Sequence, residues 1–156
     1  MKLLDLLTMK VHAARTTTED PILQFNFRMT VPGFPDGIGF VSVGGLEETI
    51  AVTEYHESGY QYAHKLPGRT SVNEITASRG EYLGDSFMKE AVKDAVTKND
   101  FRKTIIIEKL NRFGDVARTY KLAEAWVSSW TGGENNADSD DVAIEEITIQ
   151  FEYYLE

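Results

Sequence analysis

Hydrophobic and polar residues alternate along several short stretches of this chain, and the alternation predicts β-strands. In residues 23–31 every second side chain is apolar, and residues 142–154 repeat the pattern. A period of two is typical of a strand that is buried on one face. Alternation or an excess of β-branched residues predicts further strands at residues 39–43, 46–56, 71–79, 104–110 and 116–126.

Residues 85–98 carry the strongest helical pattern. Gly84 and Asp85 supply a break and a cap at its start. One apolar stripe then recurs at helical spacing, while the acidic and basic residues between its members face water. The stripe consists of Phe87, Met88, Ala91, Val92, Ala95 and Val96. A shorter helical pattern at residues 2–14 ends before Pro21.

Residues 57–70 are predicted to form a long loop, because they contain Gly59, Pro67 and Gly68. A loop of about a dozen residues without its own secondary structure is usually functional or packed on a partner. Residues 126–130 suggest a bend, and residues 132–141 a polar loop.

Seven or eight strands and one clear helix predict a mainly β fold. The expected architecture is a β-sandwich or barrel with the helix on one side. The chain has 156 residues, which is a usual size for one domain. We therefore expect an N-terminal arm at residues 1–19 and a single β-domain at residues 20–156.

The charge distribution narrows the choice of partners. The net charge is −9, and residues 132–156 hold eight carboxylates and no Lys or Arg. Gripping a phosphate backbone needs clustered Lys and Arg, so nucleic-acid binding is disfavoured. An acidic surface suits a wall that nucleic acid must pass without adhering. The sequence also suggests no membrane-spanning helix and no export signal, so we expect assembly in the cytoplasm.

The residues that usually carry chemistry form no convincing catalytic or metal-binding pattern. The absence of cysteine excludes thiol catalysis and thiolate metal sites. Asp138, Asp140 and Asp141 resemble a calcium loop in composition, but they lack its regular spacing. We expect no catalytic residues, no metal and no cofactor.

Two functions of a different class stay open at this point. One is a small enzyme of the hydrolase type that uses His56, His64 and Glu57 on a cleft loop. The second is a carbohydrate-binding sandwich that uses Trp126 and Trp130. Tryptophans of a core or an interface are the commoner interpretation of such a pair.

The order of several short motifs resembles the tail tube proteins of contractile phages, bacteriocin particles and extracellular injection systems. Lys65-Leu-Pro-Gly68 followed by Ile75-Thr-Ala-Ser-Arg-Gly80 is the most specific of these motifs. Six segments occur in the family order, and the similarity covers most of the chain. They lie at residues 20–28, 40–47, 54–59, 65–80, 126–130 and 142–145.

This resemblance implies a structural subunit rather than an enzyme. Six copies would close a homohexameric ring whose strands join into one continuous barrel, and the rings would stack into a hollow tube. The implied partners are further copies of the chain, a tail sheath protein, and baseplate or tube-initiator proteins, with DNA or protein effector cargo passing transiently. A tube-like baseplate ring, a tail-terminator ring and a type VI secretion ring protein are the rival roles within this class.

The resemblance also places the lumenal strands at residues 46–56 and 72–80, and alternation selects one face of each. The candidate lumen-lining residues are Glu47, Thr49, Thr53, Glu74, Thr76 and Ser78. Residues 57–70 are expected to contact a neighbouring ring. The candidate inter-ring residues are Glu57, Gly59, Tyr60, Lys65, Leu66, Pro67, Gly68 and Arg69.

Overall fold

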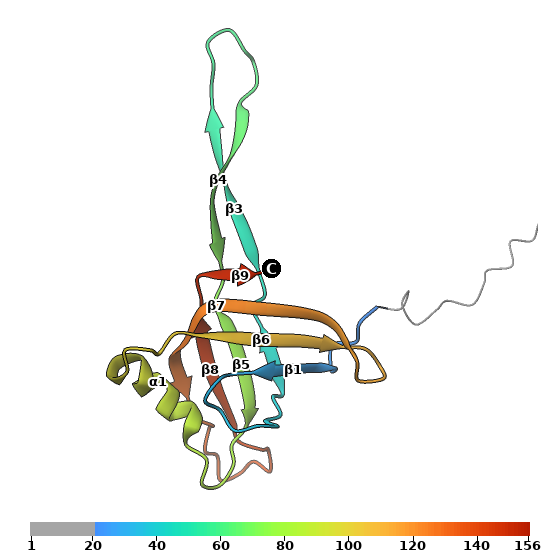
Figure 1. Ribbon diagram of the computed structural model, residues 1–156, viewed down its shortest axis with the longest axis vertical. Helices are drawn as coiled ribbons and strands as arrows, with labels where there is room; N and C mark the ends of the chain where they lie inside the picture. Colours follow the sequence, from blue (N-terminus) through green and yellow to red (C-terminus); the bar gives the residue numbers. More distant parts are fainter. Residues whose placement is uncertain (1–20) are drawn as a thin grey trace, which may run out of the picture.

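The structure is a computed structural model that describes residues 21–156, and the predicted arm at residues 1–19 lies outside this range (Figure 1). Residues 21–156 form nine strands and one helix, which confirms the predicted mainly β class. In chain order these are β1 (Phe27–Thr30), β2 (Ser42–Gly44), β3 (Glu48–Tyr55), β4 (His64–Val72), β5 (Ile75–Gly80), α1 (Phe87–Thr97), β6 (Lys103–Leu110), β7 (Val116–Thr131), β8 (Ile144–Gln150) and β9 (Tyr153–Leu155).

The long strand β7 connects the two halves of the body. Its first part pairs with β6 and β9, and its last part pairs with β8, all antiparallel. The strand order is β1-β6-β7-β8-β5-β2, with β9 added beside β7. Glu124 has a φ of 53° at the change of partner, which is an uncommon conformation for a residue that is not glycine. Strand β7 therefore passes from one half of the body into the next.

Aliphatic side chains from both halves form the core. The fully buried residues include five isoleucines on strands β5, β6 and β8 and Leu122 on β7. Helix α1 packs against β7 and buries Met88 in the same core. The predicted helix is confirmed, because Met88, Ala91 and Val92 of its apolar stripe pack on the core. The predicted alternation in residues 142–154 is also confirmed up to Phe151, which is 7% exposed.

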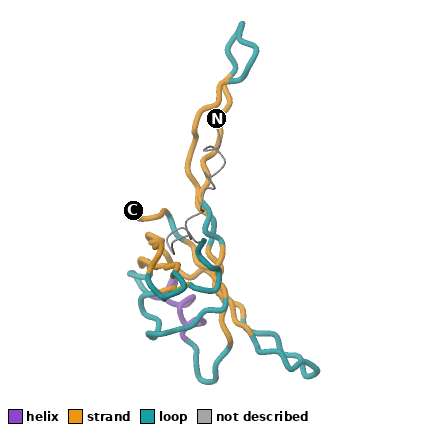
Figure 2. The backbone as a smooth tube through the Cα atoms, turned by 90° about the vertical axis from the view of Figure 1, so that its right-hand side faces the viewer, coloured by secondary structure: helices purple, strands orange, loops and turns teal. Residues whose placement is uncertain are grey.

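The largest correction concerns the predicted loop at residues 57–70. Strand β4 begins at His64 and pairs with β3 along its length, so only the tip between the two strands is a loop. Together β3 and β4 form a two-stranded hairpin that stands away from the body in both views (Figures 1 and 2). The predicted strand at residues 71–79 is wrong in its start, because Val72 ends β4 and Ile75 begins β5.

Pro67 and Gly68 are misleading as loop signals because their positions suit a bulged edge strand. Both strands of an isolated hairpin are edges, and edges tolerate a proline without an amide proton. The register shifts between Ile50 and Val52, which places Ala51 opposite the Gly68 backbone. A Cβ at Gly68 would lie 2.9 Å from the Ala51 carbonyl oxygen, so the close approach requires glycine.

The remaining predicted boundaries differ where strands exchange partners. Residues 126–130 are not a free bend, since β7 continues to Thr131 with a register shift after Val127. The single strand predicted at residues 142–154 is interrupted after Gln150, and Tyr153 begins β9 with half of its surface exposed. The strand predicted at residues 23–31 is shorter, because Leu23 and Phe25 precede β1 and are exposed.

Candidate assembly interface

Strands β2, β5, β8 and the last part of β7 form a four-stranded sheet with one polar face. Ile75 and Ala77 point into the core at 0% exposure, so Thr76 and Ser78 point the opposite way, as the alternation predicts. Thr76 pairs with Thr148. Hydroxyl and amide groups of neighbouring strands continue this face.

Polar contacts across the strands hold this face together. The Ser78 hydroxyl lies 2.6 Å from the Ser42 hydroxyl, and the Gln150 amide donates to the Glu74 carboxylate at 2.8 Å. Ser78 is only 8% exposed and its hydroxyl contacts Ser42 of the neighbouring strand β2, whereas Glu74 is exposed. Of the predicted lumen residues on and beside β5, Glu74 and Thr76 are therefore the more accessible.

Both ends of this sheet are unpaired strand edges within residues 21–156. β2 is the last strand of the order on one side, and residues 126–131 of β7 pair only with β8 at the opposite end. An unpaired edge presents backbone amide and carbonyl groups that another chain can bind. The sheet can therefore be extended at both ends by further copies.

The two faces of the hairpin differ in the side chains of residues 49–53 of β3, although the exposed Leu66 of β4 lies opposite Thr53. Thr49 and Thr53 share one face, where the Thr49 hydroxyl lies 2.9 Å from the Ser71 hydroxyl. Ile50 and Val52 lie on the opposite face and are 57% and 63% exposed. The alternation predicts this division of β3, but neither face covers the core of this chain.

An aromatic cluster forms at the tip of the hairpin. The Tyr60 and His64 rings stack with their centroids 4.7 Å apart and an interplanar angle of 10°. His64 Nε2 also lies 3.4 Å from the Glu57 carboxylate, and Tyr62 packs edge-on against Tyr60. All predicted inter-ring residues lie on the tip or on β4. The sequence prediction did not include the exposed Ile50 and Val52, which lie in the predicted strand at residues 46–56, or Tyr62, which lies in the predicted loop.

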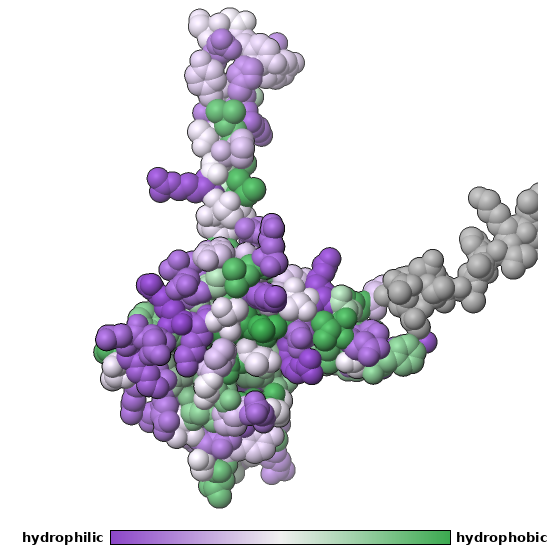
Figure 3. Space-filling model, viewed as in Figure 1, coloured by the Kyte–Doolittle hydropathy of each residue, from purple (hydrophilic) through white to green (hydrophobic). Residues whose placement is uncertain are grey.

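The rival functions find no suitable geometry at these residues. Glu57 and His64 meet on a protruding tip, not in a cleft that excludes water. Figure 3 shows the same hairpin as a narrow column with a few apolar residues in its middle part. No group of three His, Asp or Glu residues in positions 21–156 could hold a metal ion. The helix of the described chain is too short and polar to cross a membrane.

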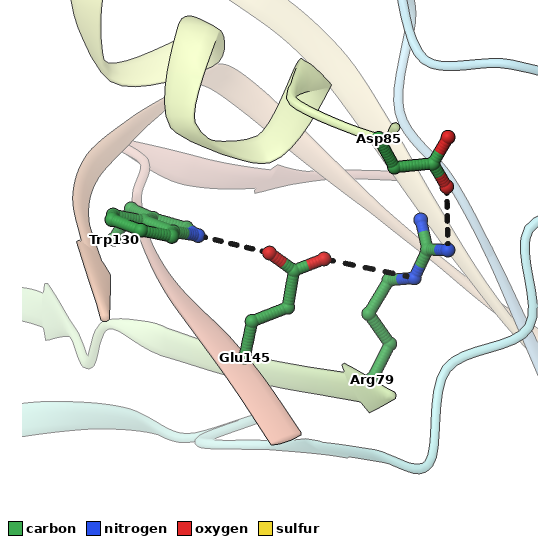
Figure 4. A network of polar contacts seen from close by, with 4 residues as sticks. All are labelled: Arg79, Asp85, Trp130 and Glu145. Atoms are coloured by element: carbon green, nitrogen blue, oxygen red, sulfur yellow. Dashed lines mark hydrogen bonds and ion pairs between the residues drawn. The ribbon is translucent and has the colours of Figure 1, made fainter. Parts of the chain in front are cut away.

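Trp130 belongs to a buried polar network rather than to a sugar platform (Figure 4). Its indole N–H donates to the Glu145 carboxylate at 3.0 Å. Glu145 faces the Arg79 guanidinium, which also binds Asp85 at 3.1 Å. Trp126 instead packs edge-on against Phe101. The two tryptophans therefore do not present adjacent exposed rings for a carbohydrate.

Residues 23–155 match the family model described as T4-like virus tail tube protein gp19. The chain belongs to this tail tube family. The match spans the core sheet, the projecting hairpin and α1, so the family architecture covers nearly all of the described residues. No curated protein sequence matches the chain significantly.

Solved structures of contractile injection systems contain similar chains. One is the tube-terminating cap of the anti-feeding prophage (26% identity, 94% of this chain and 97% of that chain, TM-score 0.78). A second is the sheath–tube complex of the extracellular injection system PVC in its extended state (26%, 89% and 93%, TM-score 0.79). A third is the PVC sheath/tube terminator (27%, 88% and 96%, TM-score 0.78).

Membership of the tail tube family makes this chain a structural protein and not an enzyme. The family and the similar structures place the chain among the tail tube proteins of phages or injection particles. A baseplate chain of the anti-feeding prophage shares the fold at 18% identity. The open sheet edges and the exposed hairpin are thus the candidate assembly surfaces of this tail tube family member.

Proposed function

We propose that this protein forms homohexameric rings that stack into the hollow inner tube of a contractile tail or injection particle. The observation that carries the proposal is the four-stranded sheet with a polar face and two unpaired edges. The tube conducts DNA or protein effector cargo and is surrounded by a contractile sheath. Assembly takes place in the bacterial cytoplasm, from a baseplate or tube-initiator protein.

Ring closure follows from the two edges. In this proposal β2 of one copy lies beside residues 126–131 of the next, and six sheets close into one barrel. A closed ring removes the strand edges that otherwise promote uncontrolled pairing. The core-facing side of each sheet is already covered by the subunit's own hydrophobic residues. Its polar side is therefore the one left to face the lumen.

The lumen wall is then acidic and rich in hydroxyl groups. On the sheet it carries Glu74 and Thr76, with the largely buried Ser78 beside Ser42 of β2. Glu47, Thr49 and Thr53 extend it along the start and the hydroxyl face of the hairpin. Carboxylates repel DNA phosphates, so a negative wall lets a polyanion pass without binding it.

Stacking is the role of the hairpin. β3 is exposed along its whole length, and an isolated two-stranded hairpin is at best marginally stable in water. The apolar face with Ile50 and Val52 and the aromatic tip are suited to burial against a subunit of the adjacent ring. A contact between different surfaces of identical copies builds an open stack when its rotation does not close, and a tube requires such a stack.

Negative-stain microscopy of the purified protein tests the proposal. We expect rings and, with time or a nucleating surface, hollow tubes. A variant in which a short Gly-Ser turn replaces residues 50–70 should fold and form rings but not stack. A strictly monomeric protein by light scattering at millimolar concentration would refute self-assembly.

A terminator or baseplate ring is the second candidate, and the similarity to the prophage cap and the PVC terminator favours it. A tube subunit should polymerise without a limit of its own, whereas a terminator should stop at one ring. The length distribution of assemblies grown from wild-type protein alone distinguishes the two. A type VI secretion ring has weaker support, because a type six secretion system protein shares the fold with a TM-score of only 0.51.

A further inference from the structure

Strand β7 carries groups of opposite charge at its two ends. At its start, the β6–β7 turn and the strand ends beside it form a basic tip, residues 109–118. This tip contains three basic residues, Lys109, Arg112 and Arg118, and a single acidic one. After β7 comes an acidic loop, residues 132–141, which has no Lys or Arg. Its carboxylates are Glu134, Asp138, Asp140 and Asp141.

The basic tip is exposed and fixed in shape. The Asn111 side-chain oxygen accepts hydrogen bonds from the backbone amides of Phe113 and Asp115, both at 2.9 Å. The Arg112 guanidinium lies 5.0 Å from the centre of the Phe113 ring, and Phe113 is 66% exposed. A guanidinium held over an aromatic ring is pre-organised for a planar carboxylate.

The three cations of the tip have no carboxylate partner in the described residues. Arg118 lies 6.0 Å from the Tyr120 ring and donates to its hydroxyl at 3.4 Å, and Lys109 lies over the same ring. The ion pairs of residues 21–156 involve different basic groups, on β1, the hairpin and β5 and at the C-terminal end of α1. The positive charge of the tip is therefore available to another molecule.

The acidic loop cannot serve as that molecule within one copy. β7 has 16 residues and changes direction at Glu124, so its two ends lie on different halves of the body. The β6–β7 turn lies at the side of the body and the loop after β7 at its foot (Figure 1). Val142, directly after the loop, is 73% exposed and supplies an apolar contact comparable to Phe113.

We propose that the basic tip of one copy binds the acidic loop of a neighbouring copy. This inference rests on the proposed self-assembly and names the charged contact within it. Two complementary surfaces at opposite ends of one strand join identical copies head to tail, and such a contact builds rings or filaments. Charge complementarity selects the partner surface and its register, with the exposed Phe113 and Val142 at the centre of the contact.

Paired charge reversals test this contact. The tip variant is Arg112→Glu/Arg118→Glu, and the loop variant is Glu134→Lys/Asp138→Lys/Asp141→Lys, which makes the loop positive. Each alone should assemble at least about tenfold less than wild type by sedimentation and microscopy, because like charges then face each other. An equimolar mixture should recover assembly, since each variant tip then meets a loop of opposite charge. The matched control is Lys93→Glu/Arg102→Glu, which makes the same charge change elsewhere on the surface and should assemble normally.

The outcomes separate this inference from the proposed function. If wild-type protein never assembles, the proposed function itself fails. If wild type assembles and both variants assemble like the control, or if the mixture does not recover, the tip–loop contact is overturned. Circular dichroism establishes that each variant is folded. Retention of a duplex DNA fragment by wild type but not by the tip variant, with unchanged assembly, would overturn the inference in favour of a nucleic-acid role.

Discussion

Arg79 and Glu145 face each other across strands β5 and β8, with Arg79 Nε 3.9 Å from Glu145 Oε1 and both side chains 6% exposed. Around them, Trp130 donates to Glu145, and the Arg79 guanidinium lies 4.7 Å and 4.8 Å from the ring centres of Tyr82 and Phe87. The pair thus links the polar-faced sheet to the loop and helix that cover it.

Removing one partner of this buried pair should destabilise the subunit strongly. For Glu145→Gln we expect a loss of about 3 kcal/mol in the free energy of unfolding, because buried Arg79 then keeps only the more exposed Asp85 as a charge partner. Denaturant unfolding of rings dissociated to monomers measures it. The neighbouring Glu146→Gln is the control and should change stability by less than about 0.5 kcal/mol, since Glu146 is exposed. Equal effects of the two substitutions would contradict the role of the pair.

Gly45 should not tolerate a side chain, whereas Gly44 should. Gly45 has a φ of +94°, and a Cβ there would collide with the Glu74 carbonyl oxygen. We expect Gly45→Ala to cost about 2 kcal/mol or more in the free energy of unfolding, from backbone strain and displacement of the turn before β3. Gly44→Ala has open space around its Cβ and serves as the control. Thermal unfolding of both variants checks this, and a wild-type melting temperature in Gly45→Ala would refute it.

The two hairpin faces should differ in their effect on stacking. Ile50→Lys/Val52→Lys should leave the subunit folded within about 0.5 kcal/mol, because both side chains are exposed in the single copy. The same variant should lose tubes, because charged side chains cannot be buried against the next ring. Microscopy and sedimentation measure the assemblies.

Thr49→Lys/Thr53→Lys is the matched control on the opposite hydroxyl face, and it should retain tubes. Loss of tubes in the threonine variant together with normal tubes in the Ile50 and Val52 variant would reverse the assignment of the two faces.

The lumen assignment can be tested with single cysteines, because the chain contains none. Glu74→Cys should react with a small maleimide in assembled tubes but not with one coupled to a polymer too large to enter the lumen. Lys93→Cys, on the exposed side of α1, should react with both reagents. Mass spectrometry after each labelling gives the result. If Glu74→Cys reacts with the large maleimide as fully as with the small one, residue 74 lies on the outer wall.

The sequence by itself determined the local structure and the family. Period-two alternation predicted which residues of β5 and β8 point into the core, and the helical stripe predicted α1. The ordered motifs indicated the tail tube family, which the family model then matched over residues 23–155. These features depend on neighbours a few residues away, so a single chain carries them visibly.

Only the tertiary structure decided which strands pair and which faces stay uncovered. Pro67 and Gly68 lie inside β4 because that strand is an edge with a bulge, a fact of pairing that local sequence does not specify. Ile50 and Val52 alternate like core residues yet remain exposed, because the hairpin leaves the body. Arg79 is buried because Glu145, 66 positions later, meets it across a strand pair. Burial depends on contacts between distant segments, and these form only when the whole sheet is assembled.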